Sequence, residues 1–169
     1  YLVIGRGGAW LSVDRWRAKR ANAAESPTEP PASTSANVAI WRIQVHMCVI
    51  YFFAGISKLL GAAWWDGTAL WWAMANPEYQ TIDMSWLAGW PRLVSVLSQI
   101  TVLWELSFAA LIWPRLTRPP MLLLAVVLHL GIGLCLGMMT FGLVMLIGCA
   151  AFLRPEWLRG AVAARQTQP

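Results

Sequence analysis

Three ionisable side chains lie inside long apolar stretches of this sequence. They are Lys58, Glu105 and His129. A charge at the centre of a bilayer costs about 2.5–3.5 kcal/mol on insertion scales, so each side chain needs a partner, a polar cavity or a position near the membrane surface. An amine that is partly removed from water can act as a general base, and a carboxylate or an imidazole can move protons or stabilise charge. The sequence therefore offers the components of proton-transfer chemistry.

Lys58 belongs to a polar stripe on the otherwise apolar segment 38–67. With about 100° of rotation per residue in a helix, the stripe consists of Gln44, Cys48, Tyr51, Gly55 and Lys58. The pattern indicates a stripe that faces the interior of a helical bundle, with Lys58 as a candidate base. The alternative stays open, because Lys58 lies roughly 30 Å along the helix, where a lysine can snorkel to the outer surface without any chemical role.

Glu105 and His129 fall near the middle of two later apolar segments. His129 shares a helix face with Ala125, Gly133 and Gly137, a small-residue groove that favours close helix packing. Glu105 and His129 are candidates for catalysis. Alternatively, they hydrogen-bond each other or neighbouring helices only to satisfy buried polarity.

The composition places the chain in a membrane. It is 58% hydrophobic and 12% charged over 169 residues, which leaves too little polar surface for a soluble core. We expect an all-α fold, a polytopic bundle of transmembrane helices. About four spans are predicted, at residues 38–60, 93–113, 120–137 and 139–153, of which the last is short. A tryptophan-rich stretch between the first two spans fits an interfacial aromatic belt or a re-entrant helix.

The sequence also predicts the organisation of the chain and its orientation. We expect a basic membrane-surface segment at 1–20, a Pro/Ser-rich linker at 21–37, a transmembrane helical domain at 38–159 and a flexible tail at 160–169. A first residue other than methionine leads us to expect a fragment of a longer protein. The distribution of Lys and Arg predicts both ends of the fragment in the cytoplasm and the Lys58 end outside it.

Other chemistries find less support. The two histidines lie on separate segments and the carboxylates are dispersed, so no metal site is predicted. The three cysteines are scattered in apolar runs and are interpreted as reduced packing residues. The basic segment is typical of a topology signal, so we expect membrane lipids as partners and no nucleic acid.

Two blocks of this sequence resemble the vitamin K-dependent gamma-carboxylases and their bacterial relatives, the horizontally transferred transmembrane (HTTM) domain proteins. The first block is YFFAGISKL, which ends with Lys58-Leu59 and is followed by Trp65-Asp66-Gly67. The second runs from Glu105-Leu106-Ser107 through His129 to Pro155-Glu156-Trp157. The resemblance covers about residues 38–159 and implies a location in a bacterial inner membrane.

The resemblance implies an activity. Lys58 would be the base that deprotonates reduced vitamin K or a menaquinol-type quinone, with oxygen and carbon dioxide as co-substrates. The oxygenated quinol would then remove a proton from a glutamyl γ-carbon, and carbon dioxide would add there. His129 is the second candidate catalytic residue, and Tyr51, Trp65 and Glu105 are candidate cofactor-binding residues. A protein or peptide carboxyl acceptor is the implied partner.

The sequence also departs from the animal carboxylases. They carry paired lysines where this chain has Ser57-Lys58, and they have a large extracytoplasmic domain that we do not expect within the present sequence. Quinol epoxidation is therefore better supported than protein carboxylation. The alternatives are a non-enzymatic scaffold module that binds lipid or quinone and, with less support, a transporter.

Overall fold

The structure is a computed structural model that describes residues 34–153. The chain divides into two compact units, residues 1–45 and 46–169. The described part of the first unit is the beginning of one helix, α2 (Thr34–Leu59), which continues into the second unit. The predicted basic segment, most of the predicted linker and the predicted tail lie outside the described residues.

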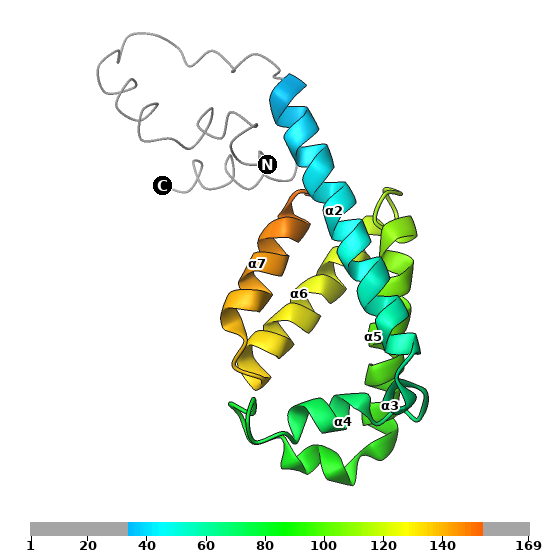
Figure 1. Ribbon diagram of the computed structural model, residues 1–169, viewed down its shortest axis with the longest axis vertical. Coiled ribbons are helices and arrows are strands. Elements are labelled where there is room, and N and C mark those ends of the chain that lie inside the picture. Colours follow the sequence, from blue (N-terminus) through cyan, green and yellow to red (C-terminus); the bar gives the residue numbers. More distant parts are fainter. Residues whose placement is uncertain (1–33, 154–169) are drawn as a thin grey trace, which may run out of the picture. The chain divides into compact units, whose positions relative to one another are not determined.

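The second unit is helical throughout its described part (Figure 1). After α2 come two short helices, α3 (Ala62–Trp65) and α4 (Ala69–Met74), and a 3₁₀ helix, η1 (Ser85–Gly89). Three further helices follow: α5 (Pro91–Leu111), α6 (Arg118–Cys135) and α7 (Met139–Ala150). Residues 34–153 contain no strand, and the all-α prediction is confirmed.

Three helices, α2, α5 and α6, are long and apolar enough to cross a membrane. The fourth predicted span is a shorter apolar helix of 12 residues, α7. The other bounds differ from the prediction by a few residues for local reasons. Thr34 and Ser35, where α2 begins, are residue types that favour helix starts, and Pro91 begins α5 because proline fits the first helical turn.

The helices α2 and α5 run antiparallel with close approach of their backbones. Proceeding along α2, Tyr51 contacts the ring of Phe108 and Gly55 faces Leu106. A Cβ at position 55 would lie 2.8 Å from the side chain of Leu106, so glycine is what permits this contact. Tyr51, Gly55 and Lys58 of the predicted stripe thus face α5.

The helices α6 and α7 form a tight hairpin. The turn between them contains Gly137, whose φ of +68° favours glycine. A Cβ at position 142 would lie 2.5 Å from the carbonyl oxygen of His129, so α7 packs directly on the backbone of α6 at that histidine. The hairpin therefore fixes the position of His129 in the bundle.

The tryptophan-rich stretch folds into α3, α4 and η1, which gather at one end of the long helices in Figure 1. It is joined to α5 by polar contacts. Gln99 Nε2 donates to the carbonyl of Trp64 at 2.6 Å, and the backbone N–H of Leu70 donates to Ser98 Oγ at 3.2 Å. At its far end Thr81 N donates to the carbonyl of Cys135 at 3.0 Å. The stretch therefore connects the beginning of α5 to the end of α6.

Candidate functional site

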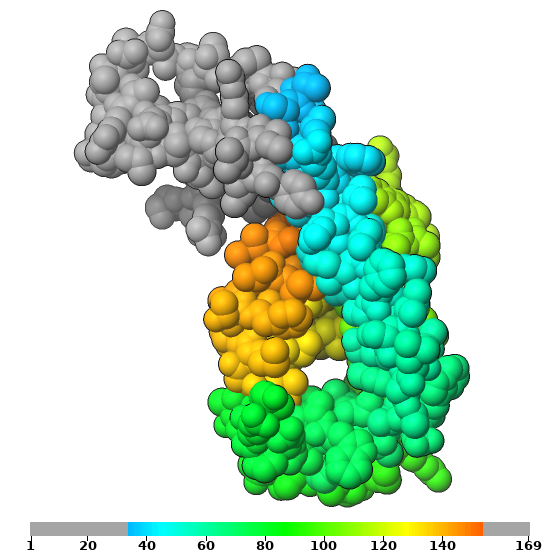
Figure 2. All heavy atoms as spheres, in the orientation of Figure 1, coloured from blue at the N-terminus to red at the C-terminus, as the bar shows by residue number. Residues whose placement is uncertain are grey.

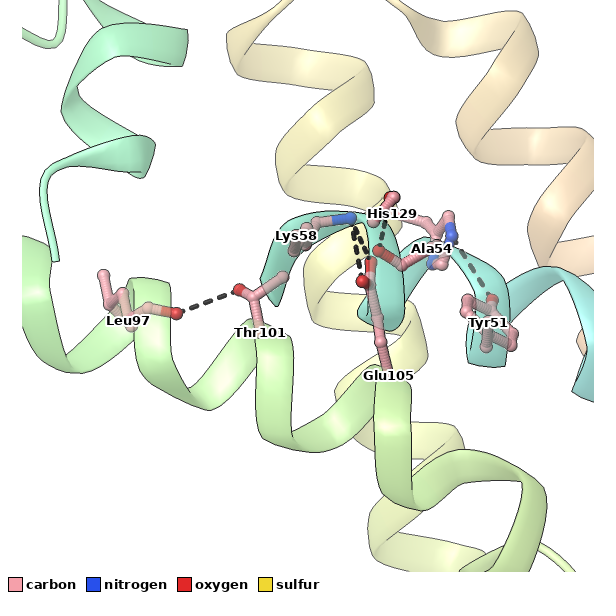
Figure 3. Close-up of polar contacts among 8 residues, drawn as sticks. Tyr51, Ala54, Lys58, Leu97, Thr101, Glu105 and His129 are labelled. Atoms are coloured by element: carbon pink, nitrogen blue, oxygen red, sulfur yellow. Dashed lines mark hydrogen bonds and ion pairs between the residues drawn. The ribbon is translucent and has the colours of Figure 1, made fainter. Parts of the chain in front are cut away.

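An ion pair joins the last turn of α2 to the middle of α5 (Figure 3). Lys58 Nζ lies 2.9 Å from Glu105 Oε1, to which it donates a hydrogen bond, and 2.8 Å from Oε2. The side chains are 21% and 12% exposed. Oε2 is buried and lies at an angle that gives it no hydrogen bond from the described residues. Both oxygens of the carboxylate thus lie within ion-pair distance of Lys58 Nζ.

The surroundings of Lys58 favour a positive charge. Its Nζ lies 5.2 Å from the ring centre of Trp64, within the range of a cation–π contact. Its place in the last turn of α2 also puts it near the negative end of the helix dipole. Lys58 is thus held between a carboxylate and an aromatic ring.

A second polar cluster lies deeper, where α2, α6 and α7 meet. The hydroxyl of Tyr51 lies 3.3 Å from His129 Nε2 and 3.2 Å from Cys149 Sγ. His129 Nδ1 lies 2.8 Å from the carbonyl oxygen of Ala125 on its own helix. Tyr51, His129 and Cys149 are each at most 4% exposed. The cluster is sealed from solvent.

Aromatic rings enclose this cluster. The ring of Trp104 lies 4.8 Å from that of Tyr51 and 6.2 Å from that of His129. Phe141, on α7, lies 6.1 Å from His129. Trp104 also donates from Nε1 to the carbonyl of Met121 at 3.2 Å, which fastens α5 to α6 beside the cluster.

The five residues predicted from the sequence fall into two groups and one outlier. The structure brings Lys58 together with Glu105, and Tyr51 together with His129. The alternative in which Glu105 and His129 bond each other is not what the structure shows, since each has a different partner. Trp65 is 67% exposed, and its indole N–H donates to the carbonyl of Leu59 at 2.7 Å. It caps the end of α2 rather than pointing to Lys58.

Sequence reasoning missed Trp64 and Cys149. Trp64, and not Trp65, is the tryptophan beside Lys58, and the sequence offers no signal for that choice because the rotation of a four-residue helix is set by packing. Cys149 was interpreted as a packing residue. Its hydrogen bond spans 98 residues of sequence, which no local pattern reveals.

The chemistry available at the Lys58–Glu105 pair is the exchange of one proton. Ammonium with carboxylate and amine with carboxylic acid have the same net charge of zero, so the two forms differ only in which atom holds the proton. No group of three or more His, Cys, Asp or Glu side chains within residues 34–153 is placed to hold a metal ion. The candidate site therefore consists of the Lys58–Glu105 pair and the cluster of Tyr51, His129 and Cys149.

Comparison with known proteins gives one match. A family model described as HTTM domain matches residues 1–157. No curated protein matches the chain. No solved structure matches it.

Proposed function

Because this integral membrane protein belongs to the HTTM domain family, we propose that it is an enzyme of the gamma-carboxylase type that acts on a quinol. The substrate is reduced vitamin K or a menaquinol-type quinone, with oxygen and carbon dioxide as co-substrates, and the reaction is epoxidation with or without carboxylation. Lys58 is the general base. The observation that carries the proposal is the partly exposed Lys58–Glu105 pair between α2 and α5.

The residues around the pair fit a quinol head group. Such a group needs an acceptor for its hydroxyl and apolar walls for its ring. Glu105 supplies a carboxylate whose side chain is 12% exposed, and the ring of Trp64 lies beside the amine. A bound hydroquinone would supply an acidic hydroxyl and a ring that reacts with oxygen.

The base is best described as the pair. If Glu105 holds the shared proton, the neutral amine of Lys58 accepts the next one; if Lys58 holds it, the carboxylate accepts. Both routes end with an ammonium beside a carboxylic acid, which carries one positive charge. That charge stabilises an anion beside it, and Trp64 and the end of α2 stabilise the ammonium.

Access for a lipid-like substrate is consistent with the surface. Figure 2 shows an opening bordered by the end of α2, the segment from α3 to η1 and the turn between α6 and α7. Apolar side chains are exposed on these helices, among them Phe53 and Leu134. An apolar tail can therefore remain in the bilayer while the head group reaches the pair.

The proposal extends to location and partners. The chain is placed in a bacterial inner membrane with the Lys58 end extracytoplasmic. Arg115 and Arg118 lie at the connection of α5 and α6, the end opposite Lys58, which supports this orientation. Membrane lipids surround the helices, and a protein or peptide is the carboxyl acceptor if carboxylation occurs.

The experiment replaces Lys58 with alanine in the full-length protein and measures quinol epoxidation and carbon dioxide incorporation. Loss of a general base predicts a fall in rate of about 10²–10⁴-fold. Arg92→Ala is the matched control, because it removes an exposed positive charge at the same end of the bundle. Activity of Lys58→Ala equal to that of Arg92→Ala would contradict the assignment.

A second candidate is a non-enzymatic module that binds lipid or quinone. The ion pair itself favours it. A lysine held by a carboxylate at 2.8 Å can have the structural role of joining α2 to α5 without any chemical role. Quinone that copurifies, shows no turnover and is lost on substitution of Lys58 or His129 would support this module over the enzyme.

A further inference from the structure

We propose that Tyr51 and Cys149 are positioning residues for His129, an assignment that rests on the proposed function. With His129 they form a continuous chain of hydrogen bonds across three helices, at 3.3 Å and 3.2 Å from the tyrosine oxygen. Figure 3 shows the bond between Tyr51 and His129. The carbonyl oxygen of Ala125 fixes which ring nitrogen of His129 carries the proton in the neutral imidazole, and the chain supplies the matching donor to the other nitrogen. It also keeps every polar atom of the chain bonded whichever charge the imidazole carries.

The tautomer follows from the partner of Nδ1. The carbonyl oxygen of Ala125, at 2.8 Å, can only accept, so Nδ1 carries a proton. In the neutral imidazole Nε2 then has a lone pair and must accept a hydrogen bond from Tyr51. Since the hydroxyl has one proton, the thiol of Cys149 donates to the tyrosine oxygen. The two bonds of the neutral chain and the bond to Ala125 therefore each have one defined direction.

The charged imidazole reverses the chain without breaking it. Nε2 then carries a proton and donates to the hydroxyl oxygen of Tyr51, and the hydroxyl donates to Cys149 Sγ. The only new covalent bond is the N–H bond at Nε2, which forms with a proton taken up from bulk acid as the pH is lowered; the hydroxyl and thiol protons only rotate. A buried polar group that loses its partner costs about 1–3 kcal/mol, and this chain avoids that cost in both states.

The packing holds the three side chains for this purpose. Tyr51 is 2% exposed and lies against the rings of Trp104 and Phe108, which leave its hydroxyl directed at His129 and Cys149. The backbone of His129 is fixed by the contact with Gly142 on α7, the helix that also carries Cys149. Neither Tyr51 nor Cys149 is placed to contact a substrate, so both act through the imidazole.

The first test is spectroscopic and needs no turnover. In the full-length protein with ¹⁵N-labelled histidine, we expect a protonated Nδ1 and an unprotonated, hydrogen-bonded Nε2, with the His129 signals identified by their loss in His129→Gln. Tyr51→Phe should move the Nε2 signal to that of a free lone pair. It should also shift the infrared S–H band of Cys149 to higher frequency, because the thiol loses its acceptor.

The control in this test is Cys48→Ala, which removes a buried thiol of α2 that is not part of the chain. It should leave the His129 signals unchanged. A proton on Nε2 instead of Nδ1 in the neutral state, or an S–H band unaffected by Tyr51→Phe, would overturn the proposal.

The second test uses the quinol reaction and a pair of substitutions. Cys149→Ser keeps a donor and an acceptor beside Tyr51, and kcat should stay within about threefold of that of the parent protein. Cys149→Ala removes both, and kcat should fall by about tenfold, as expected from the loss of one hydrogen bond at the upper end of the usual range. Equal kcat values for the two variants would contradict the assignment. If the parent protein turns over no quinol, the proposed function fails, and the spectroscopic test still decides the hydrogen-bonded chain.

Discussion

The two polar clusters of the bundle solve the problem of burying polarity in different ways. The Lys58–Glu105 pair carries opposite charges, joins two helices and stays partly exposed at the end of α2. The Tyr51–His129–Cys149 chain is assembled from groups that can all be neutral, joins three helices and is fully buried. Charges need either water or an excellent partner, whereas neutral groups need only correct geometry. The pair therefore lies within reach of the surface, whereas the chain lies in the interior of the bundle.

The largest loss of stability is expected when one member of the Lys58–Glu105 pair is removed. Lys58→Met leaves the carboxylate of Glu105 without its partner, and we expect the free energy of unfolding to fall by up to the ~3–5 kcal/mol of a fully buried pair, less the part that solvent offsets at this partly exposed site. The double variant Lys58→Met/Glu105→Leu should recover most of this loss. Thermal unfolding in detergent measures both. A double variant that is no more stable than Lys58→Met would show that the unpaired carboxylate of Glu105 is not the cause of the loss.

A smaller effect is expected at the deep cluster when its backbone support is disturbed. Gly142→Ala places a methyl group 2.5 Å from the carbonyl of His129, and overpacking of this kind costs about 1–3 kcal/mol. Gly131→Ala is the matched control on α6, since a Cβ there meets nothing within 4 Å. Thermal unfolding of both variants should separate them. Equal melting temperatures would show that α6 and α7 are not in close contact at His129.

The contact between Lys58 and the ring of Trp64 should contribute less to stability than the ion pair does. Trp64→Leu removes the ring that lies 5.2 Å from Lys58 Nζ, and the loss is expected to be about 0.5–1 kcal/mol. Trp72→Leu, which removes a tryptophan that is 68% exposed, is the control. If unfolding shows no difference between the two, the amine is stabilised by Glu105 alone.

The smallest effect is expected at an exposed carboxylate, Asp83, in contrast to the buried Glu105. It is the loss of one hydrogen bond at low pH. Asp83 accepts a hydrogen bond from the backbone N–H of Ser85 at 2.9 Å, and this bond, followed by one from the Ser85 side chain, lowers the pKa of Asp83 below its usual 3.8. A lowered pKa means that the bond contributes fully above pH 3.8 and is lost as the pH falls through the lower folded-state value.

The measurement for Asp83 is hydrogen exchange at the Ser85 amide, corrected for its intrinsic pH dependence. Protection should fall below pH 3.8 in the parent protein. Asp83→Asn, which keeps the acceptor oxygen but does not titrate, should show constant protection. A parallel fall in both proteins would assign the change to another group.

The sequence predicted the helical class and the positions of the long helices because hydropathy and length determine both. It also predicted that the stripe with Tyr51 and Lys58 faces inward, since one helical period specifies a face. Which residue of α5 meets Lys58 could not be predicted. The register of two helices depends on close approach at points such as Gly55 and Leu106, which involve residues far apart in sequence.

The candidate site was predicted in its parts but not in its pairing. Lys58, Glu105 and His129 stood out as ionisable groups in apolar segments, and that signal is local. Cys149 gave no such signal, because a cysteine in an apolar segment cannot be distinguished from a small packing residue unless its hydrogen-bond partner is known. Partners from different helices become visible only when the bundle is assembled.

The brevity of α7 has a consequence for how the protein enters its membrane. Its 12 residues extend for about 18 Å at 1.5 Å per residue, well short of a hydrocarbon core of about 30 Å. Such a segment is a weak signal for insertion by itself. Through the turn at Gly137 and the contact at Gly142 it is joined to α6, so we expect the two to be inserted together as one helical hairpin. If α7 crosses the bilayer, local thinning or snorkelling of flanking residues accommodates the shorter helix.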